Sequence, residues 1–192
     1  MASPSNLKAT SFLFLVTLIQ FQSFGQYFLP LVQPWKGRSQ ELIVGKNDPW
    51  ITPAEKAEFK TTPSYAETLL FLKLLSQKSS QIQLRELGKT AIGQPLFAVL
   101  VSKEGKGNPI DFSKTGRPTL MVQAGIHSGE IDGKDAGLML LRDIALGKKP
   151  GLLDKVNLIF IPILNVDGHE KPSPFNRPNR RGRENAGLRT DE

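Results

Sequence analysis

The sequence predicts an α/β fold with a mixed, partly parallel sheet flanked by helices, and three observations support this expectation. Residues 118–124 form an apolar run typical of a buried strand. Residues 131–146 place apolar side chains at helical spacing and are followed by Gly147 and two lysines, which favour a helix end. Residues 156–164 form a second continuous apolar run. Strand, helix and strand in this order make a β-α-β unit, whose two strands run parallel.

The segments before this unit predict a helix and an antiparallel hairpin. A Thr-Pro start signal precedes residues 64–77, where apolar side chains mark a buried helical stripe. Residues 83–87 alternate in polarity and residues 95–102 are mostly apolar, so we expect two strands joined by a connection at residues 88–93. Gly, Asn, Pro and Asp concentrate in residues 105–116, which we expect to be a loop.

The helices should pack through specific side chains. In the first helix the expected buried stripe comprises Tyr65, Ala66, Leu69, Leu70, Leu72, Leu74 and Leu75. In the second it comprises Ala136, Gly137, Leu140, Leu141 and Ile144. These sets follow the 3.6-residue period that places one face of a helix on a core.

The first 25 residues have the layout of a cleaved secretory signal peptide. Lys8 is the only charge among the first 35 residues, and it precedes an apolar run over residues 12–19. Ser23 and Gly25 supply small side chains just before a cut at Gln26. The run is shorter than the roughly 20 residues that a membrane-spanning helix needs. We therefore expect an exported protein, secreted or periplasmic, with no membrane span after signal cleavage.

The remaining chain divides into a lead-in and a domain. Residues 26–62 are polar and punctuated by proline, so we expect extended structure with a short helical turn after Thr52-Pro53. Residues 63–192 hold the predicted helices and strands. The 192-residue chain contains no cysteine, which excludes disulfides and Cys-ligated zinc.

The net charge is +7, and the basic excess is local. Residues 171–189 carry six Lys or Arg against the single acid Glu184. Such a stretch could belong to a basic, non-catalytic module that binds an anionic polymer. Phe175 is the only aromatic side chain there for base stacking, and a signal peptide removes the protein from most nucleic acid. We therefore expect a solvated basic loop and no nucleic-acid partner.

His127 and Glu130 are the most informative pair of residues. They follow the predicted strand 118–124 and Gly125, and ligand sites in open α/β sheets form at the carboxyl ends of strands. Zinc accepts both ligand types, at roughly 2.0–2.2 Å from each donor atom. A bare His-x-x-Glu pattern is common by chance, and it also fits a solvated surface turn. The position after a strand favours the metal site.

Three segments, in order along the chain, resemble the M14 metallocarboxypeptidases, the carboxypeptidase A-like zinc peptidases. Ala124-Gly-Ile-His-Ser-Gly-Glu130 resembles their zinc-binding segment, and Ile161-Pro-Ile-Leu-Asn-Val-Asp-Gly168 resembles the next strand and turn. Gly187-Leu-Arg-Thr190 is similar to a third segment, with Leu188 where an aromatic residue is usual. Residues 48–68 also look like the lead-in of exported bacterial members.

The resemblance implies roles for three residues. His127 and Glu130 would be the first two zinc ligands, and Arg189 would polarise the scissile carbonyl and hold the oxyanion. The family's substrate-binding Asn-Arg pair, its third zinc ligand and its catalytic Glu would lie beyond residue 192. The resemblance therefore implies the N-terminal portion of a zinc carboxypeptidase-like catalytic domain, with the fold incomplete at the C-terminus.

Other polar residues near these motifs are interpreted as structural. His169 comes too early in the chain to match the family's third ligand, so we expect an exposed turn histidine. Asn165 and Asp167 favour a turn. Asp132 and Asp135 follow Glu130 in the first turns of the helix, where solvation or the helix dipole explains an acid.

The function that follows is an exported zinc-dependent metallocarboxypeptidase that hydrolyses peptide bonds at or near the C-terminus of peptides. Zn²⁺ is the expected cofactor and a peptide the expected substrate. The chain as given should be inactive alone, because the base and the third ligand are not among its residues. A zinc-dependent deacylase or a cell-wall peptide amidase of the same superfamily is the alternative enzyme.

Overall fold

A computed structural model describes residues 37–105, 109–127 and 131–171 of the chain, which belong to one compact unit within residues 32–192. The expected signal peptide, residues 1–25, lies outside the described residues.

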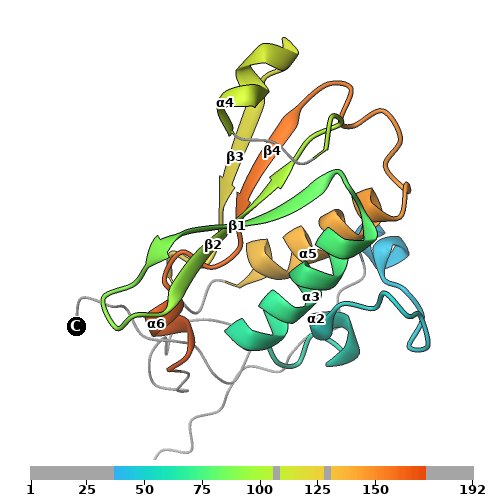
Figure 1. Cartoon of the computed structure of the whole chain (residues 1–192). Helices are drawn as coiled ribbons and strands as arrows, with labels where there is room; N and C mark the ends of the chain where they lie inside the picture. The colour runs from blue at the N-terminus through green and yellow to red at the C-terminus, as the bar shows by residue number, and fades with distance from the viewer. Residues whose placement is uncertain (1–36, 106–108, 128–130, 172–192) are drawn as a thin grey trace, which may run out of the picture. The chain divides into compact units, whose positions relative to one another are not determined.

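The described residues form a four-stranded mixed sheet, as the sequence predicts (Figure 1). The strands are β1 (Ile82–Lys89), β2 (Pro95–Val101), β3 (Thr119–Gln123) and β4 (Asn157–Ile161), in the spatial order β1-β2-β4-β3. β3 and β4 run parallel, whereas the β1–β2 and β2–β4 pairs are antiparallel. The expected β-α-β unit and hairpin are both confirmed. The hairpin connection is shorter than predicted, because β1 continues through a bulge near Gly88 to Lys89.

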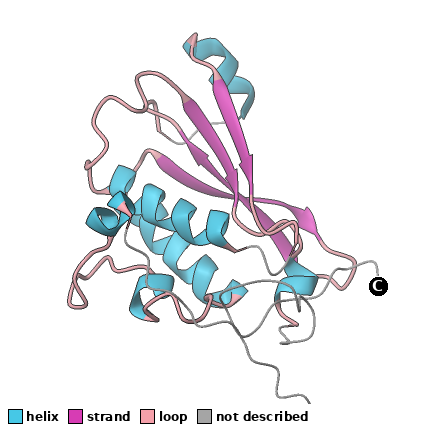
Figure 2. Cartoon of the chain, turned by 180° about the vertical axis from the view of Figure 1, so that it is seen from behind, coloured by secondary structure: helices cyan, strands magenta, loops and turns pink. Residues whose placement is uncertain are grey.

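Two long helices, α3 (Tyr65–Lys78) and α5 (Asp132–Ala145), pack side by side on one face of the sheet (Figures 1 and 2). The short helices are η1 (Arg38–Leu42), α2 (Pro53–Lys56), α4 (Pro109–Phe112), η2 (Ser113–Thr115) and α6 (Val166–His169). The expectation of a loop over residues 105–116 is wrong, since α4 and η2 lie within it. None of the described helices has the length and apolar character needed to cross a membrane.

Capping boxes fix the starts of two helices. The Ser64 side chain accepts a hydrogen bond from the Glu67 backbone N–H, while the Glu67 carboxylate accepts one from the Ser64 backbone N–H at 2.8 Å. Ser64, rather than the Thr-Pro pair before it, is therefore the N-cap of α3. Thr52 and Glu55 form the same arrangement at α2, which confirms the predicted turn after Thr52-Pro53.

The core lies between the sheet and the α3–α5 pair. Its buried apolar side chains come from both helices and from β1, β2 and β4, whereas β3 adds only the partly buried Val122. The fully enclosed side chains are Leu72, Leu75, Ile82, Val99, Val101, Leu138 and Leu141. Gly137 of α5 lies so close to the Phe160 ring of β4 that a Cβ on Gly137 would overlap the ring. This missing side chain lets the helix approach the sheet closely.

The predicted helix stripes are only partly correct. Leu70 and Leu74 of α3 are 61% and 44% exposed, whereas Phe71 and Thr68 are buried. In α5, Ala136 is exposed, and the buried face includes charged side chains, Lys134, Asp135, Arg142 and Asp143. These charged side chains can be buried because ion pairs and hydrogen bonds compensate for the hydration that they lose.

β3 is a strand as predicted, but it is not buried. Leu120 and Met121 are 54% and 59% exposed, because β3 lies at the edge of the described sheet and pairs only with β4 there. An edge strand loses the neighbour that would cover its outer side.

Candidate functional site

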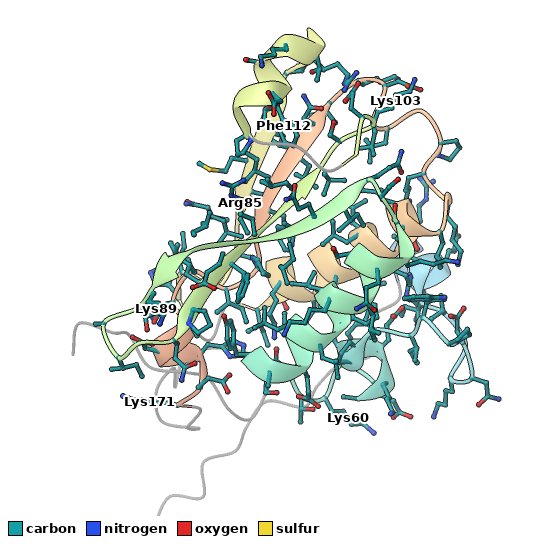
Figure 3. The ribbon with its side chains drawn as sticks, in the orientation of Figure 1. Lys60, Arg85, Lys89, Lys103, Phe112 and Lys171 are labelled. Atoms are coloured by element: carbon teal, nitrogen blue, oxygen red, sulfur yellow. The ribbon has the colours of Figure 1, made fainter. Side chains whose placement is uncertain are left out.

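The carboxyl ends of β3 and β4 meet at one edge of the sheet, because the two strands are parallel and in register from Thr119–Asn157 to Gln123–Ile161. Figure 3 shows Lys171 on this side, beyond α6, and Lys103 and Phe112 at the opposite end of the sheet. Ligand sites in α/β sheets form at the carboxyl ends of the parallel strands, which is the edge next to α6.

Beyond the two strands the chain segments stay paired. The backbone N–H groups of Leu164 and Asn165 donate to the carbonyl oxygens of Ala124 and Gly125, at 3.0 and 2.9 Å. Gly125 has φ +63°, and a Cβ there would lie 3.0 Å from the Cα of Ile163. Only glycine meets both demands without strain. The segment that carries His127 is therefore held against the segment that leads into α6.

His127 lies in a bend two residues past Gly125 and is half-buried, in the position that the sequence predicts. Glu130 and Arg189, the other expected site residues, lie outside the described residues. Within residues 37–105, 109–127 and 131–171, no group of three or more His, Asp or Glu side chains is arranged to hold a metal ion. The structure thus places one expected ligand and leaves the other two site residues as predictions.

Asp167 lies at the same edge of the sheet, and its surroundings differ from those of the simple turn residue that the sequence predicts. Asn165 behaves as expected, because its side chain caps α6 by accepting a hydrogen bond from the Gly168 N–H at 2.9 Å. Asp167 Oδ1 is buried and has no hydrogen-bond partner among the described residues. A buried carboxylate oxygen without a donor is costly and calls for a specific partner. Turn formation alone does not explain Asp167.

The expectation that His169 is an exposed turn residue is wrong. His169 is only 6% exposed, and both of its ring nitrogens have partners. Its Nδ1 lies 2.7 Å from the Glu170 carboxylate and its Nε2 lies 3.2 Å from the Lys134 ammonium. Because ammonium only donates, Nε2 accepts the hydrogen bond and Nδ1 carries the proton. His169 is therefore a neutral, buried link rather than a surface residue.

Lys134 is fully buried at the start of α5. Its ammonium donates to Thr62 Oγ1 at 2.5 Å and to the Pro63 carbonyl oxygen at 2.7 Å, besides His169. Asp135 supplies a countercharge at 3.6 Å and is itself 3% exposed. The expected solvation of Asp135 is thus wrong, whereas Asp132 is exposed as predicted.

The sequence did hold a signal for Lys134. It precedes Leu138 and Leu141 by four and seven residues, so it falls on the buried stripe of α5. Its partners Thr62 and Pro63 lie about seventy residues earlier, and the sequence alone does not reveal that contact.

Burial lowers the pKa of His169 below its ordinary value of 6.5, and the positive charge of Lys134 lowers it further. Glu170 and Asp135 act in the opposite direction. The net effect keeps the imidazole neutral at neutral pH, in agreement with its hydrogen bonds.

Three solved structures are similar to part of this chain. Carboxypeptidase A from Helicoverpa armigera is 21% identical, with 58% of this chain and 26% of that chain covered and a TM-score of 0.49. Bovine thrombin-activatable fibrinolysis inhibitor, in complex with tick carboxypeptidase inhibitor, is 19% identical, with 59% and 34% covered and a TM-score of 0.46. A metallo-carboxypeptidase from Burkholderia cenocepacia is 22% identical, with 56% and 29% covered and a TM-score of 0.45. The chain thus spans between about a quarter and a third of the length of these proteins.

The comparison with curated proteins found no match. The comparison with protein families matched residues 69–190 to the model of the M14 peptidases, the zinc carboxypeptidases. This match covers most of α3, the four described strands, α5 and α6. It extends over more than half of the 192 residues, and the chain therefore belongs to the zinc carboxypeptidase family.

Proposed function

We propose that this chain is the N-terminal part of an exported, zinc-dependent metallocarboxypeptidase that hydrolyses peptide bonds at or near the C-terminus of peptides. The observation that carries the proposal is His127, half-buried at the carboxyl end of a parallel strand in a chain of the zinc carboxypeptidase family. A peptide is the substrate, and signal cleavage before Gln26 delivers the protein to the periplasm or the exterior.

The donor chemistry fits zinc. His127 supplies an imidazole and Glu130 a carboxylate, and zinc in hydrolases takes both together with a third ligand and a water molecule. Zinc at such a site activates the water and polarises the carbonyl. His127 and Glu130 would hold the metal, and the third ligand and the catalytic base would come from residues beyond this chain. We therefore expect the 192 residues to bind zinc weakly and to lack peptidase activity.

Asp167 would orient the imidazole of His127. The two residues follow neighbouring strand ends that stay hydrogen-bonded through Gly125 and Asn165, and the buried Asp167 oxygen needs a donor. A metal-bound histidine usually donates its second ring N–H to a carboxylate or carbonyl. In a longer version of the chain that supplies the third ligand, we expect Asp167→Asn to weaken zinc binding by about 10- to 100-fold with little effect on folding.

Arg189 would stabilise the negative charge that develops on the carbonyl oxygen during hydrolysis. In a longer version of the chain that includes the remaining ligand and base, Arg189→Ala should lower kcat by roughly 10²–10³-fold. The value of KM should change much less, because the interaction strengthens only in the transition state. An equal loss through KM alone would contradict this role.

Zinc titration tests the proposal directly. The chain as given and a C-terminally longer version would be titrated with Zn²⁺ by isothermal calorimetry, together with His127→Ala. We expect weak zinc binding by the chain as given and tight binding of one zinc ion by the longer version. His127→Ala should abolish zinc binding in each of them. The longer version should cleave C-terminal residues from peptides in preference to N-acyl amino acids, the substrates of the deacylase alternative. Tight zinc binding that survives His127→Ala would refute the assignment.

A further inference from the structure

The buried ammonium of Lys134 joins three separate parts of the chain. Among its partners are three acceptors from the described residues, which are Thr62 Oγ1, the Pro63 carbonyl oxygen and His169 Nε2. Thr62 and Pro63 lead into α3, Lys134 lies in the first turn of α5, and His169 ends α6. A buried ammonium requires all of these acceptors, because each unpaired hydrogen would lose the hydration it has in the unfolded chain.

His169 extends this contact to α3 through its other ring nitrogen. Nδ1–H donates to Glu170 Oε1 at 2.7 Å, and the same oxygen accepts a hydrogen bond from the Tyr65 backbone N–H at 2.8 Å. The Tyr65 hydroxyl in turn donates to the Pro95 carbonyl oxygen. The imidazole is thus held between an ammonium that donates to it and a carboxylate that accepts from it.

This arrangement tolerates only one protonation state of the imidazole. Protonated His169 would point an N–H at the Lys134 ammonium, placing two donors and two positive charges 3.2 Å apart. The neutral ring accepts that hydrogen bond instead. Addition of one proton therefore removes the link between α5 and α6.

We infer that the Lys134–His169 hydrogen bond is a proton-sensitive link that fixes α6, and Asp167 within it, against the starts of α5 and α3 while His169 is neutral. The effect on zinc rests on the proposed function, because Asp167 matters to the metal only if His127 is a ligand. The link itself does not depend on zinc. Lys134 and His169 are thus positioning residues for the candidate site.

The charges around His169 set the direction of the effect. Lys134 and Asp135 face it from α5, Glu170 adjoins it after α6, and Tyr65 contacts Glu170 from α3. Burial and Lys134 lower the pKa of His169, against the opposite influence of Glu170 and Asp135. A lowered pKa means that the unfolded chain takes up this proton first. The contribution of His169 to stability is complete above pH 6.5 and is lost as the pH falls from 6.5 through the folded pKa.

The two histidines of the chain allow a matched test. His169→Gln keeps an acceptor near the position of Nε2 but cannot take up a proton, and His127→Gln removes the other imidazole. Thermal unfolding would be followed from pH 7.5 to 5.0 without metal. We expect the midpoint of the wild type and of His127→Gln to fall with acidification relative to His169→Gln. Parallel profiles for all three proteins would overturn the inference.

Titration of the imidazole by NMR gives a second measurement. The His169 signal, assigned by its loss in His169→Gln, should titrate below pH 6.5, and Lys134→Met should move that pKa upward because the neighbouring charge is gone. A folded-state pKa of 6.5 or above in the wild type would contradict the link. If Lys134→Met does not fold, the comparison of wild type with His169→Gln still decides.

Zinc binding separates this inference from the proposed function. In the longer version of the chain, zinc affinity should fall more steeply between pH 7.5 and 5.5 in the wild type than in His169→Gln. Zinc affinity could fall equally with pH in both proteins while their unfolding midpoints still differ as expected. That outcome would show that the link exists but does not position the site. If zinc fails to bind at any pH, the proposed function is wrong, and the unfolding and NMR results still judge the link.

Discussion

At the scale of single residues, a buried ion pair connects the lead-in to the core. Arg142 of α5 donates to both oxygens of Glu55 in α2, at 2.8 and 2.6 Å, and both side chains are almost fully enclosed. Arg142 also donates to the Leu42 carbonyl oxygen and to Asp143. Glu55 further accepts from the Val44 backbone N–H. One guanidinium thus links Leu42 and Glu55 directly to α5.

Removing one partner of this pair should be strongly destabilising. We expect Glu55→Gln to lower the free energy of unfolding by up to about 3–5 kcal/mol, because Arg142 would lose its fully buried counterion and keep only Asp143. The double change Glu55→Met and Arg142→Met should cost much less than the sum of the single changes. Urea denaturation measures both. Asp154→Asn, which breaks the exposed pair with Lys103, is the control and should have little effect. A similar cost at both sites would contradict the argument.

At the scale of the elements, the distance between α5 and the sheet is set by one glycine. A Cβ on Gly137 would overlap the ring of Phe160 in β4, so alanine there must displace either the ring or the helix. The better helix propensity of alanine is worth only about 1 kcal/mol. We expect Gly137→Ala to destabilise by about 1–3 kcal/mol overall, the usual cost of overpacking a core.

Gly133→Ala in the same helix is the matched control for this prediction. Its Cβ would meet only the Ala124 Cβ at 3.3 Å, a contact that small shifts relieve. The change in unfolding free energy should therefore be under about 1 kcal/mol. Equal effects of the two alanines in urea denaturation would mean that Phe160 does not limit the approach of the helix.

At the scale of the whole molecule, local patterns predicted the elements, and long-range contacts determined which side chains they bury. The β-α-β unit, the hairpin and the position of His127 all follow from short apolar periods and turn residues. The burial of Lys134, Arg142 and His169 does not, because their polar groups are compensated by hydrogen bonds to groups up to a hundred residues away. The exposure of β3 likewise depends on its place in the strand order. The sequence pattern therefore predicts which apolar residues are buried more readily than it predicts which charged residues are buried in pairs.

The same distribution of charges predicts how the molecule responds to acid. A hydrogen bond from Lys46 lowers the pKa of Glu58 to about 2, and one from Arg117 lowers that of Glu104 to about 2, against ordinary values of 4.5. Their contributions to stability are present above pH 4.5 and are lost as the pH falls from 4.5 to about 2. The contribution of His169 is lost separately, below pH 6.5.

Stability should therefore fall in two stages that respond differently to salt. Glu58 and Glu104 are exposed, so their stage should be shallow and should weaken between 0.01 and 1 M NaCl, where the Debye length shrinks from about 30 to 3 Å. The His169 stage should persist, because burial shields its contact with Lys134 from ions. Thermal midpoints measured from pH 7.5 to 2.5 at both salt concentrations test this. A single stage, or equal loss of both in high salt, would mean that the buried link contributes nothing beyond surface charge.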